Sequence, residues 1–268
     1  GDFVLEENAN LGIASMPGES TVITVNGSFV FEGRANVQVS GQSEMTIPGL
    51  DALATVNLTL RDSALLALPD LATFNDAMVQ LIGADVVFSV PLLANVNGAT
   101  IALSQGASLA LPLVTTLQGF TGSASGDESL FDLSNVTQTV AENGLAARIT
   151  GSDSATIDLS GLSTVGEAVT VIANSGSTVV LTGVTSIAGR VEYGTDGVID
   201  MPNLATLSGE GVLFRLGQGG SISFDSIMTV MGAPTPTVPF LTIAVNNGTT
   251  VTLPGITSIE SVELNVSN

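Results

Sequence analysis

The chain contains no cysteine, histidine, lysine or tryptophan. Without cysteine it can form neither a disulfide nor a thiolate nucleophile. Without histidine and lysine it cannot build a serine–histidine–aspartate triad, a histidine-ligated zinc site or a Schiff base. The catalytic chemistry that remains is that of carboxylates: paired acids for glycoside hydrolysis, or calcium with an arginine base for polysaccharide cleavage.

Positive charge is also scarce, because five arginines stand against 25 acidic residues and the formal net charge is −20. A surface of this charge repels phosphate backbones, so we expect no nucleic-acid partner. It is equally disfavoured at anionic membrane surfaces. No apolar run approaches the roughly 18 residues that span a bilayer, so we expect no membrane insertion.

Apolar residues, by contrast, make up 44% of the 268 residues and recur in a fixed pattern. The pattern is h-x-h-P-x-h-x-x-h, where h is apolar, and Met45–Leu53 shows it in full. We number its second h as position 0. Ten copies occur, with position 0 at Ile47, Leu68, Val90, Leu111, Leu133, Leu159, Leu181, Met201, Phe224 and Leu253. Because a period near 22 residues is typical of stacked supersecondary units, the repeat predicts a solenoid.

The apolar positions indicate what each unit contains. Positions −2 and 0 alternate with position −1, as in a strand with one buried face. Proline stands at +1 in six copies and ends that strand at a corner. A second alternating stretch, such as 58–60, follows about ten residues later, and a polar or glycine corner such as Gly106 comes next. No unit has room for a helix beside two strands.

The predicted fold class is therefore all-β: a right-handed parallel β-helix (β-solenoid) of about ten rungs of roughly 22 residues. Residues 1–40 do not fit the pattern, and we interpret them as irregular first rungs or a partial N-terminal cap. Residues 41–268 carry the β-solenoid repeats. We expect the two regions to be continuous as one domain.

Segments such as Leu109–Gly119 and Met201–Gly209 resemble the LPxLTxLxG rungs of two groups of proteins. One group is the receptor L-domain type of β-helix, also seen in fungal cell-wall proteins. The other is the leucine-rich repeat regions of secreted surface proteins from planctomycete-type bacteria. The resemblance covers roughly residues 42–268 and implies a structural or binding surface. The chain departs from the receptor type in lacking cysteines, and from true leucine-rich repeats in lacking a fixed asparagine after the strand.

Two outward-pointing acids are the candidate metal ligands. Asp132 and Asp158 both occupy position −1, in successive copies of the pattern. Stacking of these copies would bring their carboxylates about 5 Å apart, a spacing that suits calcium or a retaining glycosidase pair. The alternative interpretation is that both are solvated surface charges on an acidic protein. Calcium is the one cofactor considered, and no catalytic or cofactor-binding residue is assigned.

Outward positions on the early rungs carry a stripe of apolar residues: Leu65, Ala67, Val87, Ala110 and Leu130. An aligned apolar stripe favours cover by a loop, by the N-terminal region or by another copy. No capping segment follows residues 262–266, so we expect further repeats of a parent protein, or further copies of the chain, as stacking partners. Carbohydrate, or another surface protein, is a further expected partner.

These features favour a non-catalytic secreted β-solenoid that acts as a structural spacer or adhesion module at the cell surface or in the extracellular space. One alternative is a polysaccharide-active β-helix enzyme, a carboxylate-based hydrolase or lyase. A calcium-dependent carbohydrate-binding module is the other. With a single tyrosine and no tryptophan, the chain lacks the aromatic platform on which such proteins stack sugars.

Overall fold

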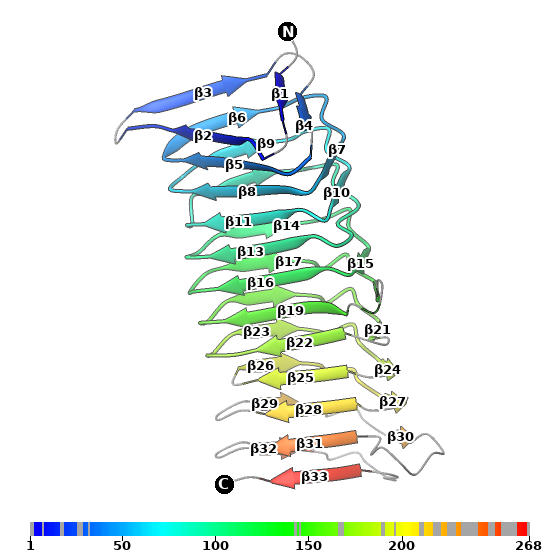
Figure 1. Cartoon of the computed structure of the whole chain (residues 1–268). Helices are drawn as coiled ribbons and strands as arrows, with labels where there is room; N and C mark the ends of the chain where they lie inside the picture. The colour runs from blue at the N-terminus through cyan, green and yellow to red at the C-terminus, as the bar shows by residue number, and fades with distance from the viewer. Residues whose placement is uncertain are drawn as a thin grey trace. The chain divides into compact units, whose positions relative to one another are not determined.

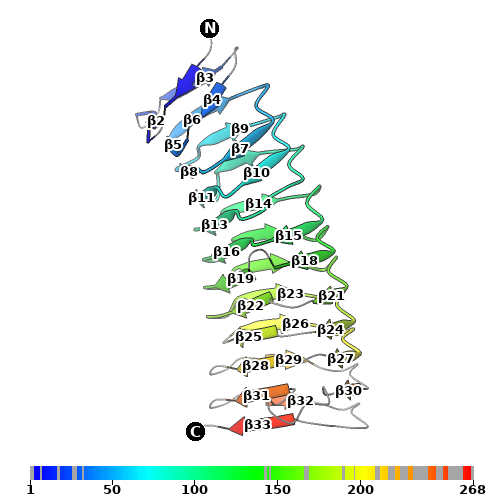
Figure 2. The ribbon, with the colours of Figure 1, turned by 45° about the vertical axis from the view of Figure 1, so that its right-hand side comes forward.

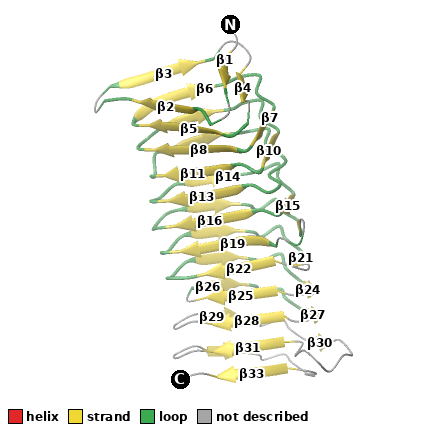
Figure 3. Ribbon diagram, viewed as in Figure 1, coloured by secondary structure: helices red, strands yellow, loops and turns green. Residues whose placement is uncertain are grey.

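The computed structural model contains strands and connecting loops, and no helix in the part of the chain that it describes (Figure 3). The described residues are 3–6, 8–16, 19–25, 29–31, 33–141, 144, 146–165, 169–188, 191–195, 197–208, 212–216, 221–223, 229–231, 241–245, 250–252 and 262–266. Accordingly, no described segment forms a helix that could span a membrane.

The described strands pair in parallel, and the chain coils as a β-solenoid of about eight turns with a spacing near 22 residues. This confirms the predicted all-β solenoid. The copies of the pattern centred on Phe224 and Leu253 lie outside the described residues. The right hand of the coil stays a prediction.

Each turn supplies up to three strands, which we call its first, middle and last strand. The chain divides into two compact units, Gly1–Val114 with Phe120–Asp132, and Thr115–Gly119 with Leu133–Asn268. Equivalent strands of successive turns lie beside one another within each unit (Figures 1 and 2). Each turn therefore hydrogen-bonds mainly with the turns before and after it.

In the first unit, six last strands form one sheet, in the order β2 (Asn10–Ala14), β5 (Ala35–Ser40), β8 (Val56–Arg61), β11 (Met78–Ile82), β13 (Thr100–Ser104) and β16 (Thr121–Ser125). The first strands pair as β3 (Ser20–Thr24), β6 (Gln42–Thr46), β9 (Leu65–Ala67) and β12 (Val87–Ser89), and as β14 (Ser108–Ala110) with β17 (Leu130–Asp132). The middle strands pair as β1 (Phe3–Leu5) with β4 (Phe29–Phe31), and β7 (Ala52–Ala54) with β10 (Thr73–Asn75).

In the second unit, the last strands follow the order β19 (Ala147–Ser152), β22 (Val169–Ala173), β25 (Val191–Thr195), β28 (Val212–Leu216), β31 (Leu241–Val245) and β33 (Val262–Val266). The first strands are β20 (Thr156–Asp158), β23 (Thr178–Val180), β26 (Val198–Asp200), β29 (Ser221–Ser223) and β32 (Thr250–Thr252). The middle strands are β15 (Thr116–Gln118) paired with β18 (Gln138–Val140), and β21 (Thr164–Val165), β24 (Ser186–Ala188), β27 (Thr206–Ser208) and β30 (Thr229–Met231).

Residues 1–40 contribute all three kinds of strand. β2 pairs in register with β5, which pairs in turn with β8, and β3 pairs with β6. Their sequence does not show the h-x-h-P pattern, yet their strands alternate inward and outward residues as the later turns do. The described part of this region therefore extends the ladders of the first unit.

The inward positions of the pattern form the core. Residues at −2, 0 and +3 are buried in all eight copies that the structure describes, which confirms the predicted register. Register pairs such as Leu109 with Phe131, and Ile157 with Val179, stack equivalent side chains on successive turns. Each such aliphatic or aromatic side chain contributes about 1.5–3 kcal/mol when fully buried. The hydrophobic core is thus a set of columns that the repeat generates.

The middle strand is a feature that the sequence pattern did not reveal. It spans positions +5 to +7, inside the segment interpreted as a short apolar turn. Position +6 points inward and is buried at Leu53, Phe74 and Leu117. Thr139 replaces the apolar residue in register with Leu117, and its buried hydroxyl has no hydrogen-bond partner among the described residues.

The turn from position 0 to +3, which we call the proline corner, is closed by the backbone. In seven turns the N–H at +3 donates to the carbonyl at 0, at 2.9–3.3 Å. Proline at +1 suits this geometry, because its fixed φ matches the second residue of a β-turn. At +2, Asn203 donates from Nδ2 to the carbonyl of Thr182 on the preceding turn, at 2.7 Å. The corner is therefore bonded both within and between turns.

The link from each last strand to the next first strand, which we call the polar corner, is made by residues with positive φ. Asp62 with Ser63, and Asp153 with Ser154, have φ values between 52° and 67°. Gly106 and Gly176 take the same role in their turns, with φ of 82° and 77°. Left-handed residues reverse the chain within two or three residues, so last strand and first strand follow almost directly.

Candidate functional surfaces

Asp158, one of the two candidate calcium ligands, is held by the corner that follows it. It ends β20, is half-buried, and its Oδ1 accepts a hydrogen bond of 2.8 Å from the N–H of Ser160. Val180 is its register partner on β23, and Asp200 lies one turn beyond Val180. The carboxylate thus has a structural role at the entry to the proline corner. Its neighbour in register on the next turn is the aliphatic Val180.

Asp132, the other candidate, ends β17 in the first unit and is also half-buried. Its register partner within that unit is Ala110, and its backbone carbonyl accepts from the N–H of Leu111 at 3.1 Å. Asp158, by contrast, belongs to the second unit. Among the described residues no three acidic side chains gather as metal ligands would. The calcium site at Asp132 and Asp158 stays a prediction.

The outward side of the last-strand sheet in the first unit is a mostly polar surface, formed by strands that lie side by side in Figure 1. We call it the amide–hydroxyl face. It consists of the outward residues Asn10, Gly12, Ala14, Asn36, Gln38, Ser40, Asn57, Thr59, Arg61, Met78, Gln80, Ile82, Thr100, Ala102, Ser104, Thr121, Ser123 and Ser125. No carboxylate occurs among these 18 residues, three from each of six strands.

Three asparagines on this face form a ladder across successive turns. Nδ2 of Asn57 donates to Oδ1 of Asn36, and Nδ2 of Asn36 donates to Oδ1 of Asn10, both at 2.8 Å. The bonds follow from the strand register, which places the three residues side by side. One row further along the strands, Gln38 lies beside Thr59 and Thr59 beside Gln80. The amides are therefore fixed in direction by their neighbours.

The sequence did not predict this ladder, although each asparagine was visible. The residues are 26 and 21 positions apart in the chain. Two of them, Asn10 and Asn36, lie within residues 1–40, which do not show the repeat pattern. Only the strand register brings them together. Asparagines at equivalent outward positions of successive turns would have predicted the ladder. The structure was needed to show that these three positions are equivalent.

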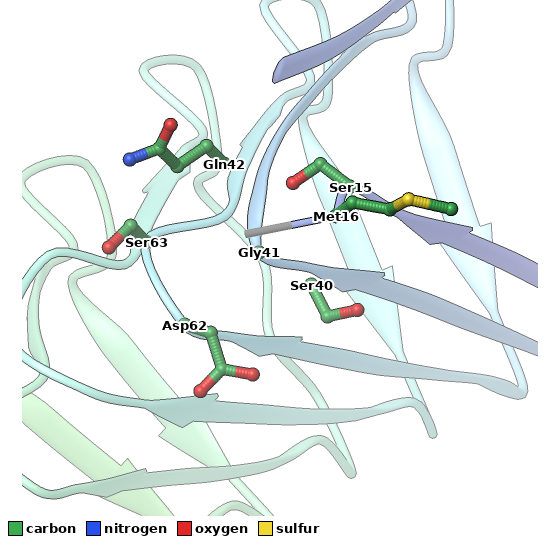
Figure 4. Close-up of a pocket in the computed structure, with 7 residues that line it drawn as sticks. All are labelled: Ser15, Met16, Ser40, Gly41, Gln42, Asp62 and Ser63. Atoms are coloured by element: carbon green, nitrogen blue, oxygen red, sulfur yellow. The ribbon is translucent and has the colours of Figure 1, made fainter. Parts of the chain in front are cut away.

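A shallow hollow of about 430 Å³ lies at a polar corner of the first unit, and Figure 4 shows its lining residues Ser15, Met16, Ser40, Gly41, Gln42, Asp62 and Ser63. The polar ends of Gln42, Ser63 and Asp62 point in different directions rather than toward one point. Gly41 has a positive φ, and a Cβ there would press against the Ser15 hydroxyl. The hollow therefore follows from a tight corner and gathers no set of converging groups.

The predicted apolar stripe is partly exposed. Val87 and Leu130 are 46% and 40% exposed, Ala110 is exposed, and Leu65 and Ala67 are half-buried. Register confirms that Leu65 and Val87 lie side by side, and that Leu65 has Glu44 on its other side. The described residues leave three of the five positions open to solvent. Cover by another copy of the chain stays a prediction.

Comparison with known proteins found no matching family model, curated protein or solved structure.

Proposed function

We propose that this chain is a non-catalytic structural spacer or adhesion module of a cell-surface or extracellular protein. The observation that carries the proposal is the repeated use of the same inward positions, buried in every described copy. A chain whose repeated pattern serves stacking gains length in proportion to the number of turns, and each turn is held by its neighbours. The resemblance of its LPxLTxLxG segments to L-domain and planctomycete-type surface repeats supports the same role.

A spacer is tested by changing its length. Inserting four additional copies of residues 69–90 after Val90 should lengthen the particle by about 19 Å, since each parallel turn adds about 4.8 Å. Solution scattering measures the change in maximum dimension. The control insert has the same composition with the order of residues shuffled, so that the apolar pattern is lost. An ordered insert that leaves the maximum dimension unchanged would contradict a spacer built by stacking.

The rival enzymatic function is tested at the two aspartates. A spacer releases no reducing ends or unsaturated products from neutral or acidic polysaccharides, with or without calcium. Asp132→Asn combined with Asp158→Asn should leave the protein folded and lower its stability in calcium-free buffer by about 1–2 kcal/mol, because the asparagine oxygen at 158 still accepts from the Ser160 N–H but without the charge. Turnover by the wild type that disappears in the double variant would establish a carboxylate enzyme instead. A calcium-dependent rise in melting temperature that the variant loses would establish the metal site.

A further inference from the structure

The amide–hydroxyl face carries no carboxylate, although the chain as a whole is acidic. The chain carries 25 acidic residues, yet none stands among the 18 outward residues of the face. Five of the 18 are amides and seven are hydroxyls, and Arg61 is the one charged residue. The first strands of the same unit, by comparison, present Glu44 and Asp132 outward. The other five outward residues of the face are Gly12, Ala14, Met78, Ile82 and Ala102, so the face is mostly polar and free of negative charge.

We propose that the amide–hydroxyl face binds a neutral polysaccharide, with the glycan chain lying along the rows that cross the strands. This names the ligand class of the adhesion role and rests on that part of the proposed function. Side-chain amides both donate and accept hydrogen bonds, and so do hydroxyls, as sugar hydroxyl groups require.

The asparagine ladder prepares the face for such a ligand. Asn36 uses one amide hydrogen toward Asn10 and one acceptor position toward Asn57. Each amide has two hydrogens and two lone pairs, so one donor and one acceptor remain for a ligand. The ladder bonds hold these groups in one orientation at the strand spacing of about 4.8 Å. Binding therefore loses little side-chain entropy.

The charges of the face and of the whole chain favour a neutral polysaccharide over an anionic one. Arg61, the one cation of the face, has its guanidinium hydrogen-bonded to the side-chain oxygen of Gln38, with the Asp62 carboxylate at 3.9 Å. A polysaccharide that carries carboxylates or sulfates would meet only this partly paired guanidinium on the face and would approach a chain of net charge −20. A neutral glycan meets no such repulsion.

The face offers no aromatic ring, so each sugar is held by hydrogen bonds alone and contributes little. Affinity then comes from length, because a polymer that spans several turns makes the same contacts repeatedly. Long chains should consequently bind much more tightly than short oligosaccharides.

Affinity electrophoresis of the full chain tests the proposal, in gels containing hydroxyethyl cellulose, galactomannan or soluble starch, and in gels containing polygalacturonate. The wild type should be retarded in at least one neutral gel, equally in low and high salt, and not by polygalacturonate. Asn36→Ala combined with Asn57→Ala should weaken that binding about tenfold, since it removes several hydrogen bonds. The control is Thr164→Ala with Ser186→Ala, which breaks a hydroxyl–hydroxyl bond of 3.2 Å on the middle-strand sheet of the second unit.

Equal mobility in all neutral gels, or an equal loss of binding in both double variants, would overturn the proposal. Retardation by polygalacturonate alone would overturn it too. Thermal melts of both double variants show whether each remains folded, and Gln80→Ala, which removes an amide outside the ladder, provides a second variant of the face. The scattering experiment on inserted turns is independent of binding. A negative result in the affinity electrophoresis therefore does not contradict the spacer role. A negative result in the scattering experiment likewise does not contradict glycan binding by this face.

Discussion

Glycine occurs at both the proline corner and the polar corner, but for different physical reasons in the second unit. At the proline corner, a Cβ on Gly161 or Gly183 would overlap the carbonyl oxygen of Ser134 or Ser160 on the preceding turn. Neither glycine has a positive φ. At the polar corner, Gly176 has a φ of +77°, and a Cβ there would come no nearer than 3.6 Å to its closest neighbour. Glycine is thus required by packing at Gly161 and Gly183, and by backbone conformation at Gly176.

Both corners contact neighbouring turns, but they do so by different groups. The proline corner is in contact with the turn before it, through close backbone approach and through side-chain bonds such as that of Asn203. The polar corner also bonds to the neighbouring turn, since the N–H of Ser154 donates to the carbonyl of Ser175 at 3.1 Å, while the side chains of Asp153 and Ser154 are exposed. Substitutions at Gly161 or Gly183 should therefore act between turns, whereas a substitution at Gly176 should act through its own backbone conformation.

Gly183→Ala should break the proline corner. The added methyl has no space beside the Ser160 and Leu162 carbonyls, so we expect a loss of about 3 kcal/mol or more in the free energy of unfolding. Gly176→Ala is the matched control in the same unit, where only the left-handed backbone resists and the loss should be about 1–2 kcal/mol. Urea unfolding followed by circular dichroism measures both. Equal losses would mean that the corners do not differ as described.

Ser129→Ala should weaken a polar corner of the first unit. The Ser129 hydroxyl accepts from the N–H of Gly106 at 3.0 Å and donates to the carbonyl of Ser125 at 2.7 Å. Its removal leaves a backbone N–H without its acceptor, which costs about 1–3 kcal/mol. A shift of the urea midpoint toward lower concentration checks this. An unchanged midpoint would show that the hydroxyl bonds are not needed.

Ser177→Ala should have the opposite sign. Ser177 occupies the same repeat position in the second unit and is fully buried, but its hydroxyl has no hydrogen-bond partner among the described residues. Replacing it with a methyl group removes a buried unsatisfied polar atom and should stabilise the protein by about 1 kcal/mol. The same urea titration measures it beside Ser129→Ala. Destabilisation of similar size in both variants would refute the distinction.

Ser154→Gly should give a small gain at an exposed polar corner. Its φ of +66° is unfavourable for a residue with a side chain, so glycine should stabilise by about 1 kcal/mol. Ser163→Gly is the control, because Ser163 is equally exposed and has no positive φ, and glycine there should destabilise. Melting temperatures distinguish the two signs. A loss of stability in Ser154→Gly would contradict the conformational account.

The sequence predicted what repeats in every turn and missed what depends on neighbouring turns. The apolar positions and the prolines are visible because each copy carries them, and the structure confirms their burial at Leu68, Leu111 and Leu159. The middle strands escaped because two or three residues are too few to show a period. The Asp62–Ser63 corner carries no glycine, so its left-handed conformation had no clear signal.

The candidate sites show the same limit. Alternation identified Asp132 and Asp158 as outward residues, but not that the Asp158 carboxylate accepts from the Ser160 N–H. The asparagine ladder depends on a register between strands whose spacing in the chain varies, which no single segment encodes. Physical contact across turns is the information that the linear pattern lacks.

Parallel, in-register stacking of turns is the central claim, and cysteine pairs in this cysteine-free chain test it most directly. Thr59 and Gln80 are register partners on β8 and β11, about 4.8 Å apart between Cα atoms. Thr59 and Ile82 both point outward but are offset by two residues, at about 8 Å. Because a disulfide requires Cα atoms within about 7 Å, mild oxidation should cross-link Thr59→Cys with Gln80→Cys and leave Thr59→Cys with Ile82→Cys reduced. Mass spectrometry that found the offset pair cross-linked, and the register pair free, would contradict the account.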